Sequence, residues 1–186
     1  MVAELTVAPG LLIAMPQLAD PNFARTVVLM VEHQVEGSFG LVLNRPAETP
    51  VSEVLGAIDV GWQGDPREPT WLGGPVQPET GWILHEHVSG LESTNTREIT
   101  PGLFLSSAPK ALKLIADTPP KRVRFILGYA GWGPEQLARE LTEGSWVNSD
   151  VSSDLIFETS AEGLWEKAVR RIGINPESLV PASGIH

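Results

Sequence analysis

The stretch from residue 123 to residue 143 constrains the fold more than any other part of the chain. Val123–Leu127 is short and apolar and predicts a strand. Gly128–Gly133 contains three glycines and two large aromatic residues, which predicts a turn. Pro134–Glu143 predicts a helix that begins at its proline. A turn of this kind presents backbone N–H groups and flat rings at one edge of a sheet, where binding sites often form.

The length and the hydrophobic content indicate a folded domain of ordinary size. The chain has 186 residues, of which 42% are hydrophobic and 19% are charged, so it has enough apolar side chains for a core and too few charges for a disordered chain. No internal repeat and no linker interrupts the pattern. The sequence therefore predicts one domain over residues 1–186.

The charge and the missing cysteines exclude several functions. A net charge of −10 repels phosphate backbones, which disfavours direct DNA binding. Without cysteine there is no disulfide, no catalytic thiolate and no Cys-ligated metal. No apolar run is long enough to cross a bilayer, and Met1–Glu4 has no positive region before an apolar core. We therefore expect a cytoplasmic protein without a membrane partner.

The remaining segments predict strands joined by both hairpins and helices. The strongest pattern is a hairpin of Thr26–His33 and Phe39–Asn44 around a turn at Gln34–Ser38, ended by Arg45 and Pro46. Further strands are predicted at Leu11–Ala14, Trp71–Val76, Gly81–His87, Leu103–Leu105 and Asp154–Glu158. Helices are predicted at Pro50–Leu55, at Pro109–Ala116 with Ser106 or Ser107 as cap, and at Ala161–Ile172 with Ser160 as cap. This mixture favours an α+β protein with a mixed sheet.

The glycines of the central turn do not form a known cofactor motif. Their order is G-x-x-G-x-G, whereas dinucleotide sites use G-x-G-x-x-G and phosphate loops end in G-K-[ST]. Pro134 removes one N–H that could hold an anion, and Glu135 adds a negative charge at the same place. A tight packing turn is the favoured interpretation, and no cofactor is expected.

Histidine and serine residues give equally weak indications of chemistry. His85 and His87 are two residues apart and would share one face of a strand, so that His33 and a carboxylate could complete a metal site. The favoured alternative places one of the pair at an exposed strand end, and no metal is expected. Ser38 lies in a hairpin and lacks the glycine pattern of a nucleophile elbow. The sequence therefore assigns no catalytic residue.

Several short blocks occur in a characteristic order along almost the whole chain. They are Leu11–Pro16 with Asp20–Phe23, Glu32–His33 with Glu36–Gly37, Gly40–Pro46, Gly73–Val76 with Leu84–His85, and Gly128–Gly133 with Gln136–Leu137 and Glu140. In this order they resemble the AlgH (YqgE-like) family of small bacterial proteins. Gln34–Val35 and Ser38–Phe39, at the hairpin tip, depart from the family pattern.

The resemblance implies a fold and says little about activity. It implies a single α+β domain whose bent mixed sheet forms a pseudo-barrel with helices packed outside. The family takes its name from a proposed transcriptional regulator of alginate production, and it supplies no established catalytic residue. A regulator with this acidic composition is expected to act through a protein or a small ligand, because the sequence has no helix-turn-helix pattern and no long basic face.

Two classes of function remain after these exclusions. The first is a non-catalytic module that binds a small ligand or a protein and has a regulatory role. The second is an enzyme, a hydrolase or transferase, with its site near the Asn44–Pro46 and Gly128–Gly133 turns. The candidate ligand-binding residues share positions at strand ends and turns, and are His33, Asn44, Arg45, Gly73, Gly74, His85, Tyr129 and Trp132.

Arg45 and Trp132 have the most specific expected roles among these candidates. Arg45 could offer a bidentate fork to a carboxylate or phosphate while Trp132 supplies a flat wall. Alternatively, Arg45 pairs with an acidic residue of the protein, such as Asp20 or Glu32, and holds the hairpin. A structure that gathers the candidates in one cleft would favour a ligand or enzyme site.

Overall fold

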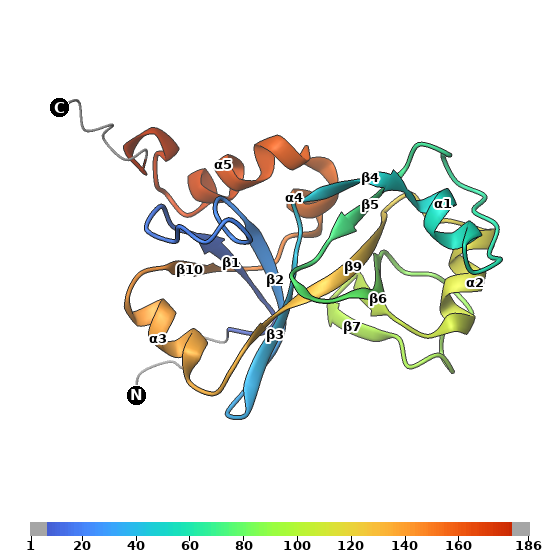
Figure 1. The fold of residues 1–186 in the computed structure, drawn as a ribbon, viewed down its shortest axis with the longest axis horizontal. Coiled ribbons are helices and arrows are strands. Elements are labelled where there is room, and N and C mark those ends of the chain that lie inside the picture. Colours follow the sequence, from blue (N-terminus) through green and yellow to red (C-terminus); the bar gives the residue numbers. More distant parts are fainter. Residues whose placement is uncertain (1–6, 180–186) are drawn as a thin grey trace. The chain divides into compact units, whose positions relative to one another are not determined.

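A computed structural model of the protein describes residues 7–179, which divide into two units (Figure 1). Unit 1 contains the described residues up to Asn44 and from Gly131 onward. Unit 2 is Arg45–Ala130. Strand β9 (Val123–Trp132) begins in unit 2 and ends in unit 1. Each unit is described by itself.

Unit 1 is an antiparallel sheet with helices. Its elements are β1 (Gly10–Ala14), β2 (Val27–Gln34), β3 (Gly37–Val42), the end of β9, α3 (Gln136–Thr142), β10 (Trp146–Ser149), α4 (Ser153–Glu158), α5 (Ala161–Arg171) and a 3₁₀ turn at Pro176–Leu179. The strand order is β10-β1-β2-β3. All five residues of β1 are buried, because the strand has a neighbour on each side and α5 packs against it. The indole of Trp165 in α5 donates a hydrogen bond to the carbonyl oxygen of Ala14, at 2.8 Å.

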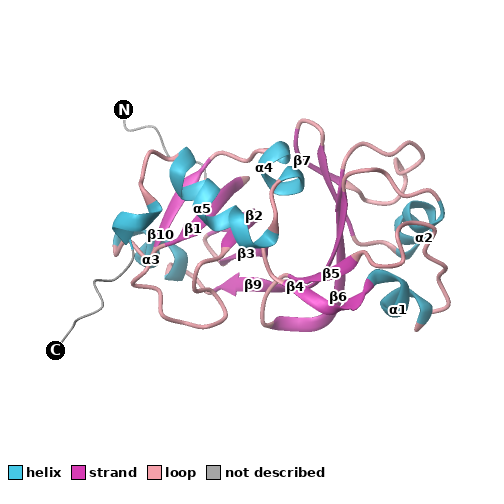
Figure 2. Cartoon of the chain, turned by 90° about the horizontal axis from the view of Figure 1, so that it is seen from above, coloured by secondary structure: helices cyan, strands magenta, loops and turns pink. Residues whose placement is uncertain are grey.

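Unit 2 combines antiparallel strand pairs with one parallel pair. Its strands and its helices are labelled in Figure 2. Its elements are β4 (Pro46–Pro50), α1 (Val51–Gly56), β5 (Pro69–Leu72), β6 (Val76–His85), β7 (Arg97–Thr100), β8 (Leu103–Ser106), α2 (Pro109–Asp117) and most of β9. Strand β9 pairs with β6 antiparallel and with β5 parallel. Beyond them, β8 pairs with β6, β7 with β8, and β4 with β5, all antiparallel.

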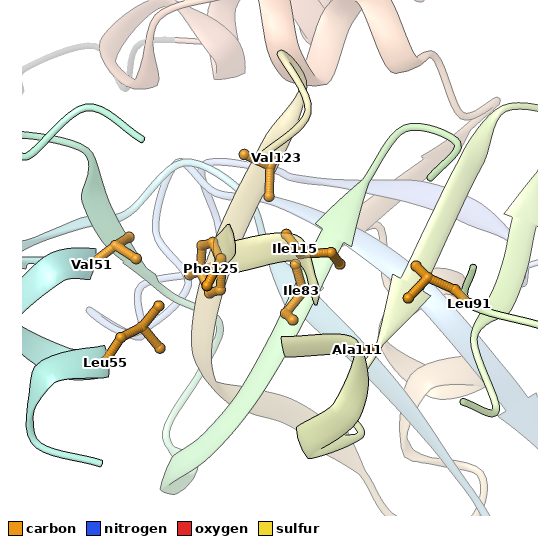
Figure 3. Close-up of a cluster of buried hydrophobic side chains, with 9 residues drawn as sticks. Val51, Leu55, Ile83, Leu91, Ala111, Ile115, Val123 and Phe125 are labelled. Atoms are coloured by element: carbon orange, nitrogen blue, oxygen red, sulfur yellow. The ribbon is translucent and has the colours of Figure 1, made fainter. Parts of the chain in front are cut away.

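The core of unit 2 lies between its sheet and its two helices (Figure 3). Ile83 of β6 and Phe125 of β9 are paired neighbours, so their side chains point to the same face. Val51 of α1 and Ile115 of α2 pack onto that face. The core therefore fixes both helices on one side of the sheet.

Two glycines allow the loop after β5 to lie directly on β9. A Cβ atom at Gly73 would lie 2.4 Å from the carbonyl oxygen of Gly128, and one at Gly74 would lie 2.2 Å from the carbonyl oxygen of Tyr129. The N–H of Gly73 also donates to the carbonyl oxygen of Leu127, at 2.8 Å. Only glycine permits two backbones to approach this closely.

The structure corrects the expected turn in the glycine-rich stretch. Gly128–Trp132 continues β9 instead of ending it, and Val76 of β6 pairs with Tyr129. Gly128 takes a φ of +75° within the strand, and the turn comes later, at Glu135 with a φ of +63°. Helix α3 consequently begins at Gln136, so the prediction that it begins at Pro134 was wrong.

A second correction concerns residues 154–158, which form a helix and not a strand. Five apolar-rich residues suit either structure, and the deciding signal is Ser152, whose side-chain oxygen accepts from the N–H of Leu155 at 3.2 Å. Strands β4, β7 and β10 were not predicted. The cap of α2 is Ala108, without a side-chain hydrogen bond, so the expectation of Ser106 or Ser107 was also wrong.

Other predictions are confirmed by the structure. The hairpin forms from β2 and β3, and Ser160 caps α5 by accepting from the N–H of Gly163 at 3.1 Å. Gly173, with a φ of +83°, follows the end of that helix. The mixture of helices with antiparallel and parallel strand pairs confirms the α+β class.

We predict that Gly74→Ala lowers the free energy of unfolding by about 3 kcal/mol. The alanine would have to adopt the φ of +150° that glycine has at this position, and its Cβ atom would clash with the backbone of Tyr129. Chemical denaturation measures the change. Gly81→Ala is the matched control, since a Cβ atom there meets nothing within 4 Å. Equal stability of the two variants would show that the close contact between residue 74 and β9 does not contribute to the stability of the fold.

Candidate functional site

A groove with a cavity of about 280 Å³ lies in unit 2 between α1 and α2. Val54 and Leu55 of α1 form one wall, and Leu112 of α2 forms the other. Phe125 and Leu127 of β9 lie between the walls. Residues of β5 and β6 complete the lining, so the groove is built from segments that are separate in the sequence and share one apolar core.

The groove exists because both helices are short and bury only part of their apolar surface. Helix α1 ends at Gly56 after six residues, and the chain then turns through Ile58, whose side chain is 58% exposed at the groove. On α2, Ala111, Ile115 and Ala116 are buried in the core, whereas Leu112 is only partly buried and lines the groove. Ile58 therefore adds exposed apolar surface to the apolar lining of the groove.

The lining of the groove is almost entirely apolar. The hydroxyl of the buried Thr70 is already used, since it donates to the carbonyl oxygen of Thr49 at 2.7 Å. Ser107 is exposed, and Glu79 is the one charged residue among the described residues that line the groove. The groove can therefore hold apolar groups, but it does not gather the polar groups that a reaction needs.

None of the eight residues proposed from the sequence, all of which are described, lines this groove. In unit 2, Gly73 and Gly74 are covered by the backbone of β9. The carbonyl oxygen of Arg45 accepts from the N–H of Leu72 at 2.7 Å. The ring of Tyr129 meets Trp82 edge-on, with centroids 6.3 Å apart.

His85 is fully buried in unit 2 and has a partner at each ring nitrogen. Its Nδ1 lies 2.6 Å from the carbonyl oxygen of Glu86, and its Nε2 lies 2.8 Å from Oγ of Ser106. Burial lowers the pKa of His85, the hydrogen bond to Glu86 opposes this effect, and the charge of His87 adds to it. A side chain without solvent access is poorly placed to meet a substrate.

In unit 1, two of the proposed residues hold the protein's own backbone and hairpin. Asn44 accepts from the N–H of Val27 at 3.1 Å and donates to the carbonyl oxygen of Arg25 at 3.0 Å. The exposed His33 lies at the end of β2, with Nδ1 2.5 Å from Oγ of Ser38 on β3. Both side chains stabilise the hairpin.

Trp132 also has a structural environment in unit 1. Its indole N–H donates to Oε2 of Glu140 at 2.8 Å, and Trp146 donates to the same oxygen at 2.9 Å. Gln136 donates to the other carboxylate oxygen at 3.1 Å. The ring of Phe23 packs against both indoles, with centroids 6.1 and 5.8 Å away. Glu140 thus joins α3 to β10 and to the end of β9.

Arg124 is a buried cation that sequence reasoning missed. Its guanidinium lies 4.1 Å from the centroid of the Trp71 ring, and the residue is 6% exposed. Burial lowers the pKa of Arg124 to about 10, while the charge of Glu68 acts in the opposite direction. In turn, burial raises the pKa of Glu68. Ile126, two residues further along β9, shares the face of Arg124, and this apolar neighbour was the available signal that the face is covered.

The described residues contain no group of three or more histidine, aspartate or glutamate side chains placed to bind a metal ion. Within residues 7–179, every helix is too short or too polar to cross a membrane.

Comparison with known proteins gives consistent matches over the whole chain. The sequence matches the model of a family described as AlgH-like over residues 11–177. It is 42% identical over 180 residues to a UPF0301 protein from Myxococcus xanthus, covering 96% of this chain and 98% of the relative. The solution structure of the AlgH protein from Pseudomonas aeruginosa matches with a TM-score of 0.78 and 34% identity, over 100% of this chain and 99% of that chain. A crystal structure from Corynebacterium diphtheriae, 22% identical with a TM-score of 0.72, covers 92% of this chain and 90% of that chain and shares the fold.

We predict that Glu140→Ala lowers the free energy of unfolding by about 2–4 kcal/mol, since it leaves the buried indoles of Trp132 and Trp146 without an acceptor. Glu140→Gln keeps one acceptor oxygen and should cost about half as much. The exposed Glu143, just beyond α3, is the control, and Glu143→Ala should change little. A Glu140→Ala protein as stable as this control would exclude the proposed role of the carboxylate.

Proposed function

This chain belongs to the AlgH-like family, and from that premise we propose that it is a non-catalytic binding module that works through the groove of unit 2. The groove between α1 and α2 is the observation that carries the proposal. It is concave and apolar, and Ile58 extends its apolar surface toward solvent.

The chemistry of the groove favours apolar side chains of a partner protein over a polar metabolite. Sites for small molecules usually enclose about 300–1,000 Å³ and place a few polar groups to orient the ligand. At about 280 Å³, this cavity is slightly below that range, and its buried hydroxyl, on Thr70, is already bonded to Thr49. Grooves that accept two or three apolar anchors of an amphipathic helix need no such polar groups.

The charge of the protein narrows the class of partner further. Glu79 is the one charged residue among the described lining residues, and the whole chain has a net charge of −10. A negatively charged protein attracts basic segments and speeds their association, and it repels acidic segments. The proposed partner segment therefore carries apolar anchors flanked by lysine or arginine.

A regulatory role fits binding of this kind. Contact with another protein lets an acidic chain influence transcription without contacting DNA, which its charge disfavours. Regulation and a cytoplasmic location both remain parts of the proposal. The enzyme alternative has weaker support: the pair of His85 and Ser106 resembles a base beside a nucleophile, but the two residues are 0% and 1% exposed.

We predict that Ile58→Asp weakens binding of an amphipathic helical peptide with leucine anchors and lysine flanks by at least about tenfold, because it replaces apolar contact area with a charge. Fluorescence anisotropy of the labelled peptide measures the affinity. Val35→Asp is the matched control, because Val35 is 85% exposed and lies in unit 1.

The same titration with glutamate flanks tests the charge argument, since this peptide should bind more weakly than the lysine peptide at low salt. Nile red, a neutral apolar dye, tests whether the groove accepts small apolar molecules. Equal peptide affinity for the Ile58→Asp and Val35→Asp proteins would refute the groove as the binding site. Tight dye binding without peptide binding would replace the protein partner with a small apolar ligand.

A further inference from the structure

A continuous row of hydrogen-bond contacts passes through the buried His85 in unit 2. At one end, Nδ1 of His85 lies 2.6 Å from the carbonyl oxygen of Glu86. On the other side of the ring, Nε2 lies 2.8 Å from Oγ of Ser106, which is itself 2.7 Å from Oγ1 of Thr96. The row thus runs from β6 to β8 and on to the segment before β7.

The row continues through Thr94 and ends at a second backbone carbonyl. Oγ1 of Thr96 lies 2.7 Å from Oγ1 of Thr94, which donates to the carbonyl oxygen of Leu91 at 2.6 Å. Both ends of the row are therefore carbonyl oxygens, which can only accept hydrogen bonds. Every proton in the five contacts must come from the imidazole and the three hydroxyl groups between those ends.

A count of these protons shows that a neutral His85 cannot complete the row. Neutral imidazole has one N–H and each hydroxyl has one O–H, which gives four protons for five contacts. The imidazolium form has two N–H groups and supplies the fifth. Only with His85 charged can each contact contain one proton, with all hydroxyl donors directed from the ring toward Leu91.

Neutral His85 loses least when its proton stays on Nδ1, because Glu86 follows His85 directly in the chain and its carbonyl oxygen has little freedom to move away from an unprotonated nitrogen 2.6 Å distant. If the single N–H of His85 donates to Glu86, Nε2 must accept from Ser106, and each hydroxyl along the row reverses its direction. The contact between Oγ1 of Thr94 and the oxygen of Leu91 then has no proton. That carbonyl still accepts from the backbone N–H of Thr94 at 3.1 Å, so only the hydroxyl needs to move away.

Burial acts against the charged form that the row favours. Burial lowers the pKa of His85, the hydrogen bond to Glu86 raises it, and the charge of His87 lowers it. The charged and titratable side chains on the elements around the ring are Glu79 on β6, Glu86 and His87 just beyond it, Glu92 in the following loop, Arg97 and Glu98 on β7, Lys121 and Arg122 before β9, Arg124 on β9, and Lys110, Lys113 and Asp117 on α2.

We propose that His85 is a proton-binding site of this protein, and that its charged form holds the segment of residues 86–96 by completing the row to Leu91. Loss of the proton releases the hydroxyl of Thr94 from Leu91. The side chain of Leu91 belongs to the core cluster that also contains Ala111 and Ile115 of α2, so the released segment adjoins that helix. The inference is independent of any ligand in the groove.

The test is an NMR titration of the His85 ring in the full-length protein and in Thr94→Val. Without the hydroxyl of Thr94, the row ends at Thr96 and has three contacts. Neutral His85 and the two remaining hydroxyl groups supply three protons, so the charged form no longer completes a contact that the neutral form lacks. The pKa of His85 should therefore fall by about one pH unit, the equivalent of one net hydrogen bond. Thr80→Val, on β6 outside the row, is the control and should leave the pKa unchanged. In the native protein, the methyl signals of Leu91 and Thr94 should titrate together with the ring.

Ser106→Ala provides a second variant if Thr94→Val does not fold. It separates the ring from the threonines and leaves each part with as many protons as contacts, so the pKa of His85 should fall again. Under the proposal, the Leu91 and Thr94 signals stop following the ring in this variant. An unchanged or raised pKa in the folded variants would overturn the proposal. So would a native His85 that stays neutral down to the pH of acid unfolding.

Discussion

The close contact between the Gly73–Gly74 loop and β9 is the constraint on which the arrangement of unit 2 depends. It brings β5 into parallel register with β9, where Thr70 pairs with Phe125. Strand β5 in turn pairs with β4, which leads directly into α1. The position of α1, and hence one wall of the groove, therefore follows from a contact that only residues without a side chain allow.

The sequence predicted those elements whose local signals agree with their tertiary contacts. The hairpin and α5 combine a regular apolar pattern with a turn or a cap, as at Ser160. The prediction failed where glycine had two interpretations. Gly128 suggested a turn, yet it continues a strand, because close approach to another backbone needs glycine as much as a turn does. It also failed for Asp154–Glu158, whose short apolar run suits either structure until the cap at Ser152 is recognised.

The candidate site was harder to predict than the fold. Polar residues at strand ends, such as Asn44, were reasonable candidates, but the structure shows that this side chain fixes the backbone of Arg25 and Val27. The groove instead depends on how far two short helices extend over the sheet, and on which residues of β6 and β9 lie between them. Neither property belongs to a single segment, so neither appears in a linear pattern. Family membership, in contrast, was recognisable because it rests on blocks distributed along the chain.

The division of the chain also affects the order in which it can fold during synthesis. Unit 2 is one continuous segment, whereas unit 1 joins residues from both ends of the sequence. All strands that pair with β5, β6, β7 or β8 have been synthesised once β9 is complete. In contrast, β1 can pair with β10 only after Trp146, the partner of Ala14, has been synthesised. Closing that loop costs more entropy than the shorter loop between Thr70 and Phe125 in unit 2, and the cost grows slowly with loop length. Until β10 emerges, one edge of the apolar strand β1 lacks its neighbouring strand, and an open apolar edge of this kind favours misassembly of the nascent chain.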